Sequence, residues 1–256
     1  MAEEASMRVG ILETGEVAED LRAVHGDYPA MFARLLRSVD PSLELATVSV
    51  VRGEMPEAPG QFDGWIVTGS RHGVYDDLPW IDPLKDFLRA CLAEGVPVVG
   101  ICFGHQILAE ATGGRAAKSD RGWGVGVLDY EVCRRPSWLS DLPDRFAVRA
   151  IHQDQVTALP DEATVLAASA FCPYAALAYG DPERPRAISL QPHPEFDAAF
   201  LDDLLAARAG VVVPEQLAAE ARASLVRPVD DTAWARLIVA YLRNAIGEAA
   251  RETAPR

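Results

Sequence analysis

Short apolar segments that alternate with helical segments constrain the fold of this chain more than any other feature. Segments 7–12, 43–51, 64–70 and 96–101 are apolar or rich in valine, which is typical of strands. Segments 28–36, 79–95 and 104–114 are predicted to form helices, and Gly95 is a predicted C-cap. This alternation predicts a mostly parallel sheet with right-handed crossovers and helices on both faces, an α/β fold.

The middle and the end of the sequence have different patterns. Segments 122–135, 145–151, 164–169, 175–179 and 186–190 look like short strands without intervening helices. They predict an antiparallel extension packed on the sheet. Segments 197–209, 214–225 and 231–246 are predicted to be helical. Since there is no repeat or low-complexity linker, we expect a single domain over 1–256, with a core at about 7–210 and a C-terminal helical extension at about 211–248.

Charge and composition exclude several classes of function. The formal net charge of −14 makes the chain a poor partner for nucleic acid or an anionic membrane. No apolar run reaches the ~18 residues of a membrane span, and the first residues do not resemble a signal peptide. The four cysteines form no CxxC pair or zinc-type cluster. We therefore expect a cytoplasmic protein with reduced thiols, no metal and, without a P-loop or other Gly-rich nucleotide motif, no cofactor.

The segment "GICFG" places Cys102 between Gly100 and Gly104, where a predicted strand meets a predicted helix. Such a junction lies at the carboxyl edge of the sheet, where open α/β folds bind ligands. The pattern matches the nucleophile elbow G-x-S-x-G with sulfur in place of oxygen, and glycines permit its tight turn. The following helix N-terminus favours the reactive thiolate. These features favour a nucleophile over the buried structural cysteine that Cys91 represents.

The segment "QPHPEF" supplies a candidate base for this nucleophile. Prolines on both sides of His193 predict an extended segment, in which residues two apart project to the same side. His193 and Glu195 therefore point the same way, and a carboxylate beside an imidazole orients it and stabilises its protonated form. By itself such a loop is more often structural, but together with the elbow it predicts a catalytic pair.

These motifs resemble those of a known family. "GICFGHQ", the glycine pair that follows it and "QPHPEF" resemble the class I, triad-type glutamine amidotransferase domain. "GWIVTGSRHGVYDDLPWI" is similar to the oxyanion-loop segment of the GMP-synthase-like branch of that family. The motifs occur in the family's order, and the resemblance covers roughly residues 7–200. It implies a flavodoxin-like sheet, in agreement with the alternation of strands and helices.

The resemblance also implies roles for individual residues. Cys102 would be the nucleophile, His193 the general base and Glu195 the acid that orients it. Cys102 would attack the γ-carboxamide of glutamine, release ammonia and form a thioester that water hydrolyses. The backbone N–H of Phe103, with one from Gly69 or Ser70, would stabilise the oxyanion.

Two further positions match substrate-contacting segments of the family. Gln106 lies on the first helical turn after the nucleophile and matches a glutamine-contacting position. His152, in "IHQDQV", matches a segment that lines the substrate pocket, although a structural histidine is an equal alternative. The sequence departs from the family at Arg71, where many members have proline. Arg71 places a cation near the mouth of the site, where His72 and Tyr75 either shape an acceptor or leaving-group pocket or belong to an exposed loop tip.

Three functions are compatible with these residues. The first is a glutamine amidotransferase that supplies ammonia to a separate synthase, since no part of this chain is large enough to be one. The second is a hydrolase of γ-glutamyl amides or peptides. The same thioester chemistry serves both functions, because the acyl group is identical and only the leaving amine differs. The third is a non-catalytic binding or regulatory module, against which the complete triad argues.

Overall fold

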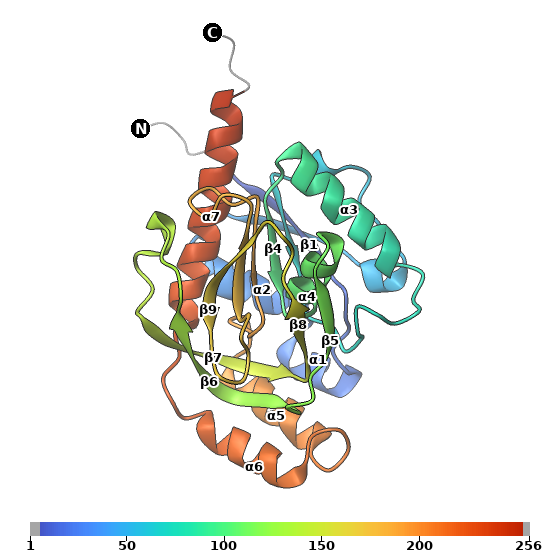
Figure 1. Cartoon of the computed structure of the whole chain (residues 1–256). Helices are drawn as coiled ribbons and strands as arrows, with labels where there is room; N and C mark the ends of the chain where they lie inside the picture. Colours follow the sequence, from blue (N-terminus) through green and yellow to red (C-terminus); the bar gives the residue numbers. More distant parts are fainter. Residues whose placement is uncertain (1–5, 253–256) are drawn as a thin grey trace.

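The computed structural model describes residues 6–252, with side chains up to residue 245. The predicted domain also includes 1–5 and 253–256, which lie outside the described residues. A sheet forms the centre of the molecule (Figure 1). It has nine strands in the order β2-β1-β3-β4-β11-β10-β9-β6-β7. Its strands are β1 (Arg8–Leu12), β2 (Glu44–Val48), β3 (Gly64–Val67), β4 (Val98–Ile101), β6 (Gly124–Val132), β7 (Arg145–His152), β9 (Ala163–Ala168), β10 (Ala176–Tyr179) and β11 (Ala187–Leu190).

Five adjacent strands of the sheet are parallel, as the α/β pattern predicts. Strands β2, β1, β3, β4 and β11 are mutually parallel, and β10, β9, β6 and β7 continue the sheet with antiparallel pairings. The antiparallel strands thus join the parallel part edge to edge instead of packing on it, and β11 belongs to the parallel part. Strands β5 (Arg115–Lys118) and β8 (Asp154–Ala158) form a separate antiparallel pair.

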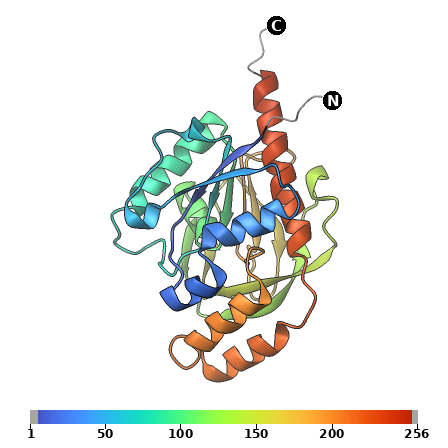
Figure 2. The same cartoon turned by 180° about the vertical axis from the view of Figure 1, so that it is seen from behind.

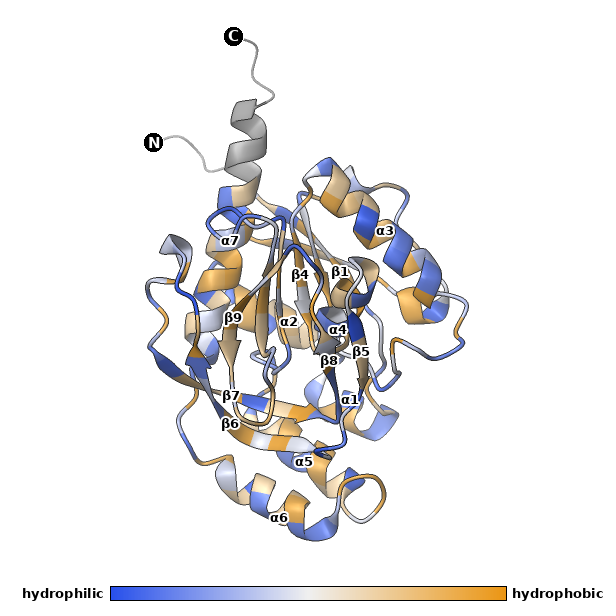
Figure 3. Cartoon of the chain, in the orientation of Figure 1, coloured by the Kyte–Doolittle hydropathy of each residue, from blue (hydrophilic) through white to orange (hydrophobic). Residues whose placement is uncertain are grey.

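Helices cover both faces of the sheet, as predicted (Figures 1 and 2). Apolar side chains of α2 and α7 pack on one face, and those of α3 and α4 on the other. Helices α1, α5 and α6 share a third apolar cluster with β6 and β7. The central strands are mainly apolar, whereas α3 carries both apolar and polar surfaces (Figure 3). The helices are α1 (Glu19–His25), α2 (Tyr28–Arg37), α3 (Ile81–Glu94), α4 (Phe103–Ala111), α5 (Ala198–Arg208), α6 (Glu215–Ser224) and α7 (Asp231–Glu252), and the 3-10 turns are η1 (Val50–Arg52), η2 (Pro59–Gln61) and η3 (Ser137–Leu139).

Some elements differ from those expected from the sequence. Strand β2 ends at Val48 because the chain turns through η1, after which Gly53 adopts a left-handed φ of 87°. Helix α1 is not predicted from the sequence, because within it only Leu21 is buried. Within residues 6–252, no helix has the length and apolar character needed to cross a membrane.

Candidate active site

Cys102 lies in a strained turn between β4 and α4. Its φ of 53° is the only positive φ of a non-glycine residue in the described part of the chain. The turn is close-packed, because a Cβ on Gly100 would lie 2.4 Å from the carbonyl oxygen of Gly104. A Cβ on Gly104 would lie equally close, at 2.4 Å, to the carbonyl oxygen of Val67. Both glycines are therefore required by backbone contact, and backbone strain of this kind is concentrated at functional sites.

His193 and Glu195 follow β11, which pairs in parallel with β4, so their loop opens at the same edge of the sheet as Cys102. The Nδ1–H of His193 donates to Oε1 of Glu195 at 2.7 Å, and both side chains are buried. Gly69 lies close to both His193 and Cys102, because a Cβ added to it would lie 2.8 Å from Cε1 of His193 and 3.7 Å from Cβ of Cys102. The fold thus brings the three predicted side chains to one place.

The electrostatic surroundings of His193 favour its protonated form. Burial by itself lowers the pKa of this imidazole, but the Glu195 carboxylate and the Cys102 side chain raise it to about 10. The ring also stacks on Phe196, with centroids 4.0 Å apart and an interplanar angle of 7°. His193 is therefore an imidazolium at neutral pH, paired with the Glu195 carboxylate.

The loop after β3 and the first turn of α4 present backbone donors next to Cys102. Within residues 6–252, the N–H groups of Gly69, Ser70 and Phe103 make no hydrogen bond to a protein acceptor. Thr14 holds this loop in place, because its Oγ1 donates to the carbonyl oxygen of Thr68 at 3.0 Å and its N–H donates to Oγ1 of Thr68 at 3.0 Å. Unused donors on a fixed backbone are suited to binding a negatively charged oxygen.

A cavity of about 510 Å³ opens at Cys102, and Gln106 and His152 line it. Nε2 of Gln106 donates to the carbonyl oxygen of Asp154 at 2.9 Å and to Oε1 of Gln191 at 3.1 Å. Nδ1 of His152 donates to the same Asp154 carbonyl at 3.1 Å, while its buried Nε2 has no partner among the described residues. Burial lowers the pKa of His152 to about 4, so its ring is neutral at pH 7 and Nε2 is an acceptor.

The loop that carries Arg71 forms part of the cavity wall. Arg71, His72 and Tyr75 line the cavity, and the Tyr75 hydroxyl donates to Oδ2 of Asp154 at 2.8 Å. The loop thus has features of both alternatives, because it lines the cavity and Tyr75 is 54% exposed. Among the described residues, no group of three histidine, cysteine or acidic side chains is arranged to hold a metal ion.

A family model, glutamine amidotransferase class-I, matches residues 28–206. The chain belongs to the class I glutamine amidotransferase family. Gamma-glutamyl peptidase 4 of Arabidopsis thaliana is 26% identical over 235 residues, which cover 88% of this chain and 91% of the peptidase. One subunit of the glutamine-hydrolyzing GMP synthase of Methanococcoides burtonii is 30% identical over 172 residues, covering 67% and 83% of the two chains.

Solved structures show the same amidotransferase fold. A glutamine amidotransferase from Thermotoga maritima superposes with a TM-score of 0.74 at 20% identity, covering 95% of this chain and 99% of the other. A glutamine amidotransferase from Methylobacillus flagellatus gives a TM-score of 0.71 at 20% identity, covering 93% and 94%. At these identities the likeness concerns the fold.

Arg149 supports the site in this class I amidotransferase domain, although no sequence pattern indicates it. Its carbonyl oxygen accepts from the N–H of His193 at 2.7 Å, and its Nη1 donates to the carbonyl oxygen of Phe196 at 3.1 Å. The guanidinium also pairs with Asp231 at the start of α7, and the two side chains are only 10% and 14% exposed. Arg149 therefore fixes both ends of the loop that carries His193 and Glu195.

The other cysteines of this amidotransferase, unlike Cys102, do not line the cavity. Cys91 and Cys172 are buried, Cys133 is exposed, and all four thiols are free. Burial raises the pKa of the Cys91 thiol to about 12, and that of Cys172 to about 12 as well. Cys91 and Cys172 are therefore unreactive thiols of the hydrophobic core.

Proposed function

We propose that Cys102, His193 and Glu195 form a catalytic triad that hydrolyses γ-glutamyl amide bonds. The observation that carries the proposal is the buried His193–Glu195 hydrogen bond of 2.7 Å at the same sheet edge as the strained Cys102 turn. A nucleophile, a base and a group that orients the base are the parts that covalent amide hydrolysis needs.

In the proposed reaction, the Cys102 thiolate attacks the γ-carbonyl carbon and forms a C–S bond. The C–N bond then breaks, and the His193 imidazolium gives its proton to the departing amine. Water next attacks the γ-glutamyl thioester while His193 takes up one of its protons. The C–S bond breaks, glutamate leaves, and the thiolate and imidazolium are restored. Glu195 keeps the imidazole oriented and stabilises its charged form throughout.

The proposed oxyanion donors are the N–H of Phe103 and one N–H from Gly69 or Ser70. They are free of protein acceptors within the described chain and belong to a loop and a helix turn that adjoin the nucleophile. Such a preorganised donor contributes about 10²–10³-fold to the rate.

Gln106 and His152 are proposed to position the glutamyl group. Both line the cavity at Cys102. The neutral ring of His152 offers an unpartnered Nε2 as an acceptor for an N–H of the substrate. Gln106 contributes by fixing the cavity wall beside the glutamyl group, because its amide N–H groups donate to Asp154 and Gln191.

A γ-glutamyl peptide is the favoured substrate. The match to the γ-glutamyl peptidase relative spans 88% of this chain, whereas the match to the GMP synthase relative spans 67%. Glutamine hydrolysis that supplies ammonia to a separate synthase is the second candidate, supported by the latter relative. The chemistry at Cys102 is the same for both substrates. We place the protein in the cytoplasm, where its four free thiols stay reduced.

The test is to assay purified protein with glutamine and with γ-glutamyl dipeptides for release of glutamate. We expect turnover of at least one of them, and a loss of at least about 10³-fold in Cys102→Ala. Cys91→Ala is the matched control and keeps its activity, since that thiol is buried away from the cavity. The glutamine-like electrophile diazo-oxo-norleucine is expected to label Cys102 and spare Cys91. Full activity in Cys102→Ala would contradict the proposal.

A further inference from the structure

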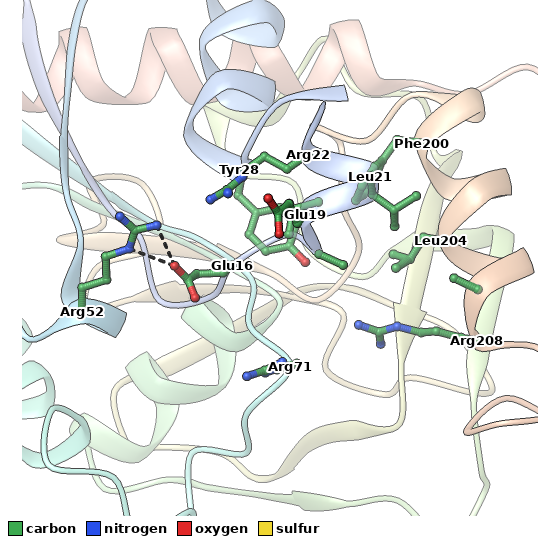
Figure 4. A pocket seen from close by; sticks show the side chains of 13 residues that line it. Glu16, Glu19, Leu21, Arg22, Tyr28, Arg52, Arg71, Phe200, Leu204 and Arg208 are labelled. Atoms are coloured by element: carbon green, nitrogen blue, oxygen red, sulfur yellow. Dashed lines mark hydrogen bonds and ion pairs between the residues drawn. The ribbon is translucent and has the colours of Figure 1, made fainter. Parts of the chain in front are cut away.

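A second cavity adjoins the one at Cys102. It has a volume of about 480 Å³ and lies between α1, the start of α2 and α5 (Figure 4). Arg71 and Arg208 line both this cavity and the one that contains Cys102. The two arginines therefore stand at the boundary between the cavities, and either volume is large enough for a small molecule.

The second cavity is basic, although the whole chain has a net charge of −14. Four arginines and two glutamates line it. Arg52 is already paired with Glu16 at 2.7 Å. Among the side chains of residues 6–245, no carboxylate lies within 4.0 Å of the guanidinium of Arg22, Arg71 or Arg208. A concave surface with unpaired guanidinium groups attracts an anion.

Tyr28 links the second cavity to the catalytic base. Its ring stacks on Phe196 at 5.9 Å, and Phe196 stacks on His193 at 4.0 Å. Tyr28 is 7% exposed. Figure 4 shows that its hydroxyl and the guanidinium of Arg208 both point into the second cavity. Burial raises the pKa of Tyr28 to about 12, so the hydroxyl is a hydrogen-bond donor at neutral pH. The rings of Tyr28 and Phe196 thus connect the second cavity to His193. The Tyr28 hydroxyl and the Arg208 guanidinium are donors suited to a carboxylate.

We propose that Arg71 and Arg208 bind a carboxylate on the leaving group of the substrate, so that the second cavity selects γ-glutamyl compounds whose released amine is an amino acid or peptide. The inference rests on the proposed function. Arg71 and Arg208 line the same cavity as Gln106 and His152, so a glutamyl group held beside those two residues leaves both arginines within the cavity for the leaving group. Guanidinium groups recognise carboxylates with paired hydrogen bonds, and Tyr28 adds one more donor.

The test compares kcat/KM for γ-glutamylglycine and γ-glutamylglycinamide, which differ in one carboxylate and hardly in size. We expect the wild type to prefer γ-glutamylglycine by about tenfold or more, the size of a charge-assisted hydrogen bond. Arg71→Gln and Arg208→Gln are each expected to reduce this preference, and the double variant to bring the ratio close to one. Arg208→Lys, which keeps the charge but loses the paired geometry, is expected to give an intermediate ratio.

Arg222→Gln is the matched control. It removes the same charge, but Arg222 lies on α6, pairs with Asp202 and lines neither cavity. Its ratio should equal that of the wild type, and thermal melting checks that every variant is folded. A wild-type ratio near one, or an unchanged ratio in the folded double variant, overturns the inference. In that case the proposed function still stands if γ-glutamylglycinamide is hydrolysed and the hydrolysis depends on Cys102. If the wild type hydrolyses neither these dipeptides nor glutamine, the proposed function fails, and this inference with it.

Discussion

At the scale of single residues, the backbone of Cys102 explains how its side chain is presented. A φ of 53° is uncommon for a residue with a side chain and persists only where the surroundings enforce it. Here the N–H of Cys102 donates to the carbonyl oxygen of Leu190 at 2.8 Å, and its carbonyl oxygen accepts from Gln106 at 3.0 Å. The strand that precedes His193 therefore also holds the turn that presents the sulfur.

The charge state of His193 is the first prediction at this scale. Because its pKa of about 10 in the folded protein exceeds the usual 6.5, the imidazole stays protonated through neutral pH. Cys102→Ala and Glu195→Gln should each lower that pKa, since both side chains raise it. Titration of the ring ¹⁵N signals by NMR measures both, with Cys91→Ala as a control that leaves the pKa unchanged. An unchanged pKa of His193 in either variant would contradict this account.

The same shift fixes the direction of a stability change with pH. The stabilising contribution of protonated His193 is fully present below pH 6.5 and is lost as the pH rises towards about 10. Wild-type Tm should therefore fall more steeply across this window than the Tm of His193→Gln. Differential scanning calorimetry measures Tm against pH for both proteins, and equal slopes would contradict this prediction.

At the scale of elements, the close packing of β3, β4 and α4 depends on two glycines. Gly104→Ala would place a Cβ 2.4 Å from the carbonyl oxygen of Val67, so α4 has to move away from β3. We expect a loss of about 1–3 kcal/mol in the free energy of unfolding, together with reduced activity. Gly60→Ala is the control, since nothing lies within 4 Å of its added Cβ. Urea unfolding measures both, and an equal stability of the two variants would refute the prediction.

Elements with a complete apolar or amphipathic pattern could be predicted from the sequence, whereas short or half-polar ones could not. Strand β4 and helices α2 and α3 have such patterns, and they form within a few residues of the expected bounds. Strand β8 has a mixed burial pattern with exposed residues at its end, and its pairing with β5 joins segments about 40 residues apart. Local periodicity carries no information on such a pairing.

At the scale of the whole molecule, the Arg149–Asp231 pair connects the loop that carries His193 and Glu195 to the C-terminal helix α7. Arg149→Met would leave the Asp231 carboxylate buried without its partner and the Phe196 carbonyl without its donor. We expect a loss of about 3–5 kcal/mol in the free energy of unfolding, the usual result of breaking a buried pair. Urea unfolding measures this loss.

The control for this prediction is a half-exposed pair of the same kind. Arg222→Gln breaks the contact between Arg222 and Asp202, whose side chains are 45% and 39% exposed. This variant should lose no more than about 1 kcal/mol in the free energy of unfolding. Equal losses in Arg149→Met and Arg222→Gln would show that the buried pair does not hold α7 to the loop.

The sequence predicts the residues of the candidate site that lie in local motifs and misses those that meet only in the fold. Cys102, His193 and Glu195 stand in short patterns with a chemical meaning, and the structure brings them together, although their roles stay predictions. Arg149 lies in a strand, and Asp231 is 82 residues further along the chain. Tyr28 and Arg208 reach the second cavity from different helices, so only the folded arrangement places them together.

The strand order has a consequence for synthesis of the protein. Strand β4, which leads to Cys102, has β11 as its neighbour on one side, and β11 begins only at Ala187. As the chain leaves the ribosome, β4 keeps an open edge until residues 187–190 have emerged, and His193 arrives only after them. An incomplete chain therefore exposes an unpaired strand edge and lacks the proposed base, so the proposed hydrolysis requires that β11 has first paired with β4.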